Sequence, residues 1–157
     1  MVSRANKKLW FLRRLKALGA SHGDLKEVYM KQIRCILEYA APVWHSSLTA
    51  GESIQIERVQ KSALRIILRE KYHSYNYALE YMQLETLNSR RDRLCSKFAE
   101  KCLRSKKFSK WFKNELKETI TRQRYPKFCP VYSRTKRYEL SPICYMTKLL
   151  NKSKKSQ

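Results

Sequence analysis

Apolar residues recur along most of the chain at intervals of three and four, which is the spacing of one face of an α-helix. The sequence has only three glycines and no Asn-Gly or Asp-Gly pair of the kind that forms tight β-hairpins. We therefore predict an all-α fold. It is a small bundle of about five to six helices, followed by a basic extended C-terminal segment and a short terminal helix.

Local signals place the ends of several helices. Gly19 is a good residue to stop the first helix, Pro42 to stop the second, and Thr49-x-x-Glu52 is a capping box at the start of the third. The expected helices cover about residues 6–18, 24–41, 50–69, 75–82, 87–104 and 107–120. In the first of them we expect the apolar stripe to consist of Phe11, Leu12, Leu15 and Leu18.

The pattern changes after Thr121. The segment "RQRYPKFCPVYSRTKRYEL" contains two prolines, many basic and tyrosine residues, and little periodicity, so we expect it to be extended. Ser141-Pro142 then resembles an N-cap followed by proline in the first helical turn, which predicts the short terminal helix. We divide the chain accordingly into a helical bundle, residues 1–120, and a basic, partly extended segment, residues 121–157.

The net charge is the most unusual property of the composition. The 157 residues include 35 Lys and Arg against 13 Asp and Glu, giving +22, of which residues 71–157 carry +15. Repulsion of this size disfavours a compact state unless a polyanion relieves it. RNA or DNA is the first partner to consider and an anionic membrane surface the second.

The sequence offers little for catalysis or metal binding. It has no phosphate-binding glycine motif, no nucleophile motif and no pair of neighbouring aspartates. Five cysteines without a C-x-x-C pair or a signal peptide suggest reduced thiols, buried as small hydrophobes, in a nuclear or cytoplasmic protein. We therefore expect no enzymatic activity, no metal site and no cofactor, and no apolar run is long enough to cross a bilayer.

The stretch "LEYAAPVWHSSLT", residues 37–49, has two interpretations. Trp44 and His45 could belong to a binding or catalytic turn, or the stretch could be a helix connector. No carboxylate, cysteine or second histidine lies near His45 in the sequence. We favour the connector, with Trp44 as a hydrophobic lid on the corner.

Two of the expected helices have a basic face. In the third, Ile56, Val59, Ala63 and Ile67 share one side of a helical wheel and the cations share the other. In the fifth, a basic stripe runs beside an apolar face that we expect to include Phe98. The candidate phosphate-binding residues of the third helix are Arg58, Lys61, Arg65 and Arg69, and those of the fifth are Arg90, Arg93, Lys97, Lys101 and Arg104.

Basic and aromatic residues also alternate in the C-terminal segment. We add Arg134, Lys136 and Arg137 to the candidates, because cations can bind a nucleic-acid backbone while neighbouring rings stack on unpaired bases. The alternative is a strap whose tyrosines pack on the bundle, which would have the same composition. The tyrosines at positions 72, 75, 77 and 81 are expected to be core and capping residues.

Six blocks in register resemble a known family. They are "KKLWFLRRLKALG", "ILEYAAPVWHSSLT", "IERVQKSALRII", "LETLNSRRDRLCSKFAEKCL", "FSKWF" and "RTKRYELSPICYMTKLLN". In this order they are similar to the C-terminal end, the thumb and the region beyond it, of reverse transcriptases of non-LTR (LINE-type, jockey-like) retrotransposons. The resemblance covers about residues 4–152.

The resemblance implies an RNA-directed DNA polymerase fragment that grips template–primer or element RNA. It also implies a reverse transcriptase palm domain as a partner. The Tyr-x-Asp-Asp-type aspartate pair of that palm is not in this sequence, so polymerase activity is not carried over. Alternatives are a protein-interaction or membrane-surface protein, a mitochondrially targeted one given the basic "RANKKLWFLRRLKALGAS", or a decayed element copy without function. Preference for RNA or DNA and the oligomeric state stay open.

Overall fold

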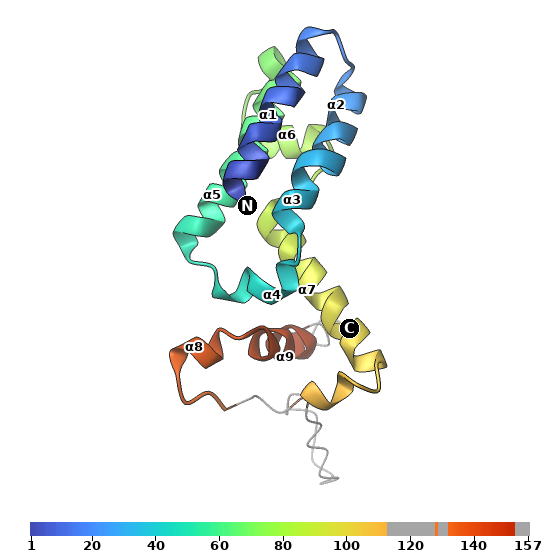
Figure 1. Ribbon diagram of the computed structural model, residues 1–157. Helices are drawn as coiled ribbons and strands as arrows, with labels where there is room; N and C mark the ends of the chain where they lie inside the picture. The colour runs from blue at the N-terminus through green and yellow to red at the C-terminus, as the bar shows by residue number, and fades with distance from the viewer. Residues whose placement is uncertain (113–127, 129–131, 153–157) are drawn as a thin grey trace. The chain divides into compact units, whose positions relative to one another are not determined.

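The computed structural model describes residues 1–112, 128 and 132–152. Every regular element in these ranges is helical, which confirms the all-α prediction (Figure 1). The chain forms two compact units. Unit 1 consists of Met1–Ala41 and Leu48–Arg91, and unit 2 of Pro42–Ser47 and Asp92–Gln157. This division differs from the predicted one, whose boundary at residues 120 and 121 lies outside the described residues.

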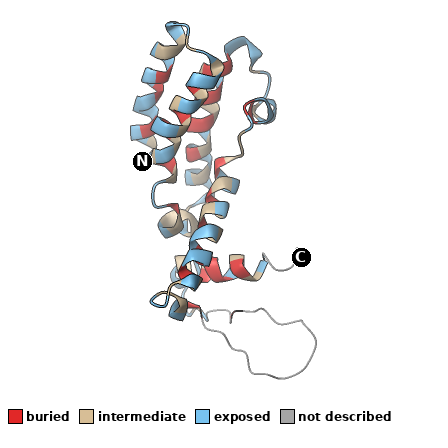
Figure 2. Ribbon diagram, turned by 90° about the vertical axis from the view of Figure 1, so that its right-hand side faces the viewer, coloured by how far each residue is buried: buried red, intermediate tan, exposed pale blue. Residues whose placement is uncertain are grey.

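Unit 1 is built around three helical segments. They are α1 (Val2–Ala17), a bent segment made of α2 (His22–Val28), a π-helical stretch (Tyr29–Arg34) and α3 (Cys35–Glu38), and α5 (Ala50–Leu68). The short α6 (Tyr75–Tyr81) and the start of α7 (Leu87–Arg104) complete the unit. In Figure 2 the buried residues of this unit lie between the helices and the exposed ones on their outer faces.

The π-helical stretch follows from the spacing of the core residues. Leu25, Tyr29, Ile33 and Leu37 are buried and stand four residues apart. Four residues overshoot a 3.6-residue turn, so this row would drift around a regular α-helix. A wider π-turn reduces the drift and keeps Tyr29 and Ile33 directed into the core. Because the predicted helix over 24–41 assumed a uniform period, it did not anticipate this change.

Several predicted boundaries are confirmed by the caps. Gly19 has φ +85° and its N–H binds the carbonyl of Lys16, while the N–H of Ala20 binds Leu15, as in a Schellman motif. Thr49 and Glu52 form the predicted capping box before α5. The second break differs: Ala40 takes a positive φ of 52°, and Pro42 lies within the short α4 (Ala41–Trp44) that follows.

The buried face of α1 differs in part from the predicted one. Ala5, Leu9 and Leu12 are buried, whereas Phe11 is 41% and Leu18 81% exposed. The predicted stripe was right for Leu12 and wrong for Phe11 and Leu18, because every position from 9 to 12 is apolar and periodicity alone allowed two faces.

Unit 2 packs the later part of α7 against α9 (Pro142–Lys152) and short connecting elements. Its core contains Ala99, Cys102, Phe112, Phe128, Met146 and Leu150. The side-chain amide of Asn151 both donates to the carbonyl and accepts from the N–H of Phe128, each at 3.1 Å, and so fixes this residue to α9. Ser141 accepts a hydrogen bond from Cys144 N–H at the start of α9, as its sequence predicted.

Two predictions in this region need correction. The expected helix over 107–120 is replaced, as far as residue 112, by turns and a 3₁₀ turn at Ser109–Trp111, and the rest of it lies outside the described residues. Part of the expected extended segment is helical: Thr135 caps the short α8 (Lys136–Glu139).

None of the helices in the described ranges could span a membrane.

Candidate nucleic-acid interface

The basic stripe of α7, apart from Arg90, lies in unit 2 and is exposed. Arg93, Lys97, Lys101 and Arg104 all fall in one sector of the helix and face solvent. Their rise from first to last is about 17 Å at 1.5 Å per residue. Glu100 is exposed in the same sector, so the stripe carries one opposing charge. Phe98, expected in the apolar face, is 39% exposed.

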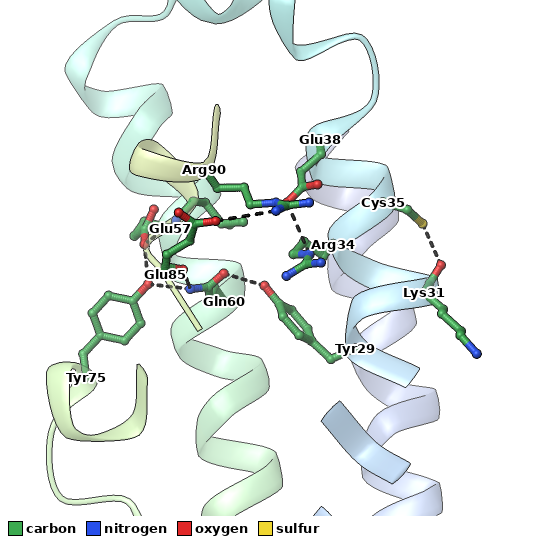
Figure 3. A network of polar contacts seen from close by, with 11 residues as sticks. Tyr29, Lys31, Arg34, Cys35, Glu38, Glu57, Gln60, Tyr75, Glu85 and Arg90 are labelled. Atoms are coloured by element: carbon green, nitrogen blue, oxygen red, sulfur yellow. Dashed lines mark hydrogen bonds and ion pairs between the residues drawn. The ribbon is translucent and has the colours of Figure 1, made fainter. Parts of the chain in front are cut away.

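Arg90 differs from the other candidates on α7 because it belongs to unit 1 and is engaged there. Its Nε donates to Glu38 Oε1 at 2.8 Å, and its Nη1 lies 3.5 Å from Glu85 Oε1 (Figure 3). The hydrogen bond from Arg90 to Glu38 is the main reason that the pKa of Arg90 is raised. Glu38 also pairs with Arg34 at 3.3 Å. Arg90 is thus committed to carboxylates within the fold.

The basic face of α5 lies in unit 1 and is bordered by tyrosines. Lys61 Nζ is 4.8 Å from the ring centre of Tyr75, and Arg65 Cζ is 5.3 Å from that of Tyr72. Such cation–π contacts hold a charged head in place without neutralising it. Arg58 and Arg65 are exposed, and Lys61 is half-buried.

Arg69 departs from the predicted helical wheel. It follows the last residue of α5 and has a positive φ of 46°, so it begins a 3₁₀ turn. Its side chain is exposed. Within the described ranges, none of the four α5 candidates makes an ion pair with an acidic side chain.

The C-terminal candidates lie around α8 in unit 2. Arg134 precedes the helix, and Lys136 and Arg137 form its first turn. All three side chains are exposed, as are Tyr132 at 87% and Tyr138 at 46%. The predicted mixture of cations and rings is therefore on the surface, although Lys136 and Arg137 are helical and not extended.

A buried polar cluster occupies the interior of unit 1 (Figure 3). Tyr29 donates to Gln60 Oε1 at 2.6 Å, and Gln60 Nε2 donates to the hydroxyl of Tyr75 at 3.1 Å and to the carbonyl of Glu85 at 2.9 Å. Tyr75 in turn donates to Glu57. Burial raises the pKa of both tyrosines, and the Glu57 carboxylate adds to the effect at Tyr75. Both hydroxyls therefore stay protonated and donate hydrogen bonds that connect several helices of unit 1.

A second polar cluster, in unit 2, was not found by sequence reasoning. His45 Nε2 lies 2.6 Å from Asp92 Oδ1, and the hydroxyl of Tyr145 donates to the same oxygen. The His45 and Tyr145 rings meet edge to face at 5.4 Å. His45 therefore has the carboxylate that its sequence neighbourhood lacked. No local signal could have indicated it, since Asp92 is 47 residues away.

The two serines that follow His45 form hydrogen bonds to the backbone. Ser46 Oγ donates to the carbonyl of Leu140 at 2.7 Å, and Ser47 Oγ to that of Trp44 at 2.9 Å. These hydroxyls are therefore directed at backbone carbonyls and not at the imidazole. In the described part of the chain no three His, Cys, Asp or Glu side chains gather closely enough to hold a metal ion.

The cysteines follow the prediction in part. Cys95, Cys102 and Cys144 are buried, and burial raises the pKa of the Cys102 thiol. Cys35 is exposed, because it lies on the outer face of α3, and Cys129 lies outside the described residues.

Exposed tyrosines on α6 also differ from expectation. Tyr77 and Tyr81 are 40% and 45% exposed and stack with their ring centres 5.9 Å apart. Tyr75 has the expected half-buried position.

Comparison with known proteins adds no assignment: no protein family, curated protein or solved structure matches the chain.

Proposed function

We propose that this chain binds nucleic acid through phosphate contacts and has no catalytic activity of its own. We further propose that it corresponds to the thumb and post-thumb region of a non-LTR retrotransposon reverse transcriptase, as the six sequence blocks suggest. RNA or DNA is then its partner, and a palm domain is a second one. The exposed cations of α7 are the observation that carries the binding proposal.

The distribution of acidic side chains supports this proposal. Most of the described acids take part in caps, hydrogen bonds or ion pairs, and several of these, such as Glu27 and Glu139, lie at the surface. The acids with such contacts are Asp24, Glu27, Glu38, Glu52, Glu57, Glu85, Asp92 and Glu139. Among the residues that the structure describes, only Glu70, Glu80 and Glu100 make no such contact. Most of the described acids therefore already have partners within the protein, whereas Lys97, Lys101 and Arg104 face solvent, where a polyanion can bind.

The α7 stripe can be tested by removing charge without removing helix propensity. We would change Lys97, Lys101 and Arg104 to glutamine and measure binding to duplex, hybrid and single-stranded probes over a salt series. Affinity should fall for every probe, and the salt dependence should become shallower by up to about three phosphate contacts, roughly 0.9 log units each. Sequence dependence should be small, because phosphate contacts carry little sequence information.

Two controls separate stripe binding from general charge. R13Q/K71Q/K110Q removes the same charge from exposed positions that form no ion pair in the described structure, and should weaken binding less and leave the slope nearly unchanged. Glu100→Gln removes the one acid of the stripe and should tighten binding. Circular dichroism shows whether each variant is folded. If the stripe variant and the control weaken binding equally, the stripe has no special role.

The absence of catalysis is tested by primer extension. The purified protein, given a primed RNA template, dNTPs and Mg²⁺ or Mn²⁺, should extend no primer, because it contains no neighbouring aspartates to hold the metal ions. Extension above a buffer control, retained after removal of contaminating enzymes, would contradict the proposal.

A further inference from the structure

The outer face of α1 combines cations with exposed aromatic rings. Arg4, Lys7 and Lys8 are exposed on it, together with Trp10 at 63% and Phe11 at 41%. Large aromatic side chains usually bury most of their surface, so two adjacent exposed rings need an explanation. The core of unit 1 does not use this face, since it takes Ala5, Leu9 and Leu12 from the same helix.

These side chains surround a hollow in unit 1. Trp10, Phe11 and Ile36 of α3 form its apolar part, and Arg4, Lys7 and Lys8 complete the lining. Its volume is about 480 Å³, within the range of small-ligand sites. Arg14 lies over the Trp10 ring, with Cζ 5.9 Å from its centre, and restrains the indole. The site is thus an apolar floor rimmed by positive charge.

The charge around the hollow is one-sided. No acidic residue precedes Asp24 in the sequence. Glu38 is the acid nearest to Ile36 in sequence, and its carboxylate is engaged by Arg34 and Arg90 with only 13% of the side chain exposed. Glu27 pairs with Lys31. An occupant of this hollow should therefore present a flat apolar ring joined to negative charge.

We propose that the α1 hollow binds an unpaired base of a single-stranded nucleic acid. The base stacks on Trp10 and Phe11, and its flanking phosphates bind Arg4, Lys7 and Lys8. Stacking on aromatic rings is tolerant of sequence and requires a base that is not paired. A hollow with a small apolar floor of Trp10, Phe11 and Ile36 fits one planar ring, whereas a membrane surface is bound by a long apolar helix face.

This inference rests on the proposed function only for the chemical class of the ligand, because its site is distinct from the α7 stripe. It adds a preference that phosphate contacts alone do not provide. The protein should bind single strands through α1 in addition to any backbone contacts, whereas a duplex, with its bases paired, can use only the backbone contacts.

The test replaces Trp10 by alanine and compares three probes of equal length. They are a single strand, a strand in which abasic sites replace the bases, and a duplex. Trp10→Ala should weaken single-strand binding about tenfold, the effect of losing one base stack. Binding to the abasic strand and the duplex should not change, and the salt slope should be the same. Leu18→Ala, at an exposed residue directly after α1 and outside the hollow, should affect no probe.

The possible outcomes distinguish this proposal from the α7 proposal. If Trp10→Ala has no effect, or weakens all three probes equally, the base site is refuted while the stripe can stand. If Trp10→Ala weakens only the single strand but the α7 variant binds normally, the base site stands and the stripe is refuted. A wild-type protein that binds no probe refutes both. Binding of vesicles rich in phosphatidylserine that depends on Trp10, with single-strand binding unchanged, would make this face a membrane contact and overturn the proposal.

Discussion

Each unit places a carboxylate beside a tyrosine hydroxyl, but the two carboxylates differ in how they are shielded. In unit 1, Glu57 accepts from Tyr75 and from the N–H of Leu87 at 3.1 Å. Its second oxygen is buried and has no partner among the described residues. In unit 2, Asp92 accepts from Tyr145 and contacts His45, and 41% of its side chain is exposed. Water can reach the Asp92 carboxylate and replace a lost hydrogen-bond partner there. It cannot reach the buried second oxygen of Glu57.

This difference determines how much each cluster contributes to stability. A hydrogen-bonding group that is left unsatisfied in the interior costs far more than one that water can reach. The cluster in unit 1 also joins more chain segments, because Gln60 links Tyr29, Tyr75 and the backbone at Glu85. Substitutions in the two clusters should therefore have clearly different effects.

The largest effect is expected for Gln60→Leu. The substitution keeps the approximate volume of a side chain that is only 1% exposed. It removes the acceptor of the buried Tyr29 hydroxyl and one donor to the carbonyl of Glu85, which should lower the free energy of unfolding by about 3 kcal/mol. Urea unfolding measures the loss, and hydrogen–deuterium exchange should place it in unit 1. Gln55→Leu, at an exposed position of α5, is the matched control and should change stability little.

An intermediate effect is expected for Arg90→Gln. Glu38 and Glu85 would lose a charged donor that is 24% exposed, at a cost of about 2 kcal/mol because the site is partly shielded. The salt dependence of nucleic-acid binding should stay the same, since Arg90 is committed to these carboxylates. If the Arg90→Gln protein is folded and its nucleic-acid affinity depends less steeply on salt than that of the wild type, Arg90 contacts a phosphate after all.

A smaller effect is expected for Asp92→Asn. The amide oxygen can still accept from Tyr145, and water can reach the site, so the loss should be about 1 kcal/mol. Hydrogen–deuterium exchange should show faster exchange in unit 2. A loss as large as that of Gln60→Leu would contradict the comparison, because exposure would then not weaken the cluster.

Local signals in the sequence were sufficient for most of the helices. Thr49, Glu52 and Gly19 act within a few residues of their own position, so α5 and the end of α1 could be predicted. The exposed cations of α7 also followed from helical spacing. These features depend on contacts between residues that are neighbours in the chain.

Features that depend on distant residues could not be predicted. Arg90 has the same helical position as its neighbours in the stripe, and only the fold brings Glu38, 52 residues away, next to it. The same holds for His45 and Asp92. On α1, the choice between two apolar faces depends on the neighbouring helices, so the exposure of Trp10 and Phe11 became visible only in the structure.

The smallest effect concerns a carboxylate that is open to solvent, Glu52. Hydrogen bonds from the N–H and hydroxyl of Thr49 lower the pKa of Glu52 below its usual value. A lowered pKa favours the charged form in the folded state. Its stabilisation is therefore present above the ordinary glutamate pKa and is lost as the pH falls through the lowered one.

Glu52→Gln removes this contribution, so its effect should depend on pH. Near neutral pH the variant should melt at a slightly lower temperature than the wild type, and the gap should close as the pH falls below the ordinary glutamate pKa and through the lowered pKa of Glu52. Glu80→Gln serves as the control, because Glu80 is exposed and has no capping contact in the described structure. Thermal melting followed by circular dichroism measures both. A difference in melting temperature that stays constant with pH would mean that the charge of Glu52 does not contribute to stability. The capping box would then stabilise the fold through its hydrogen bonds alone.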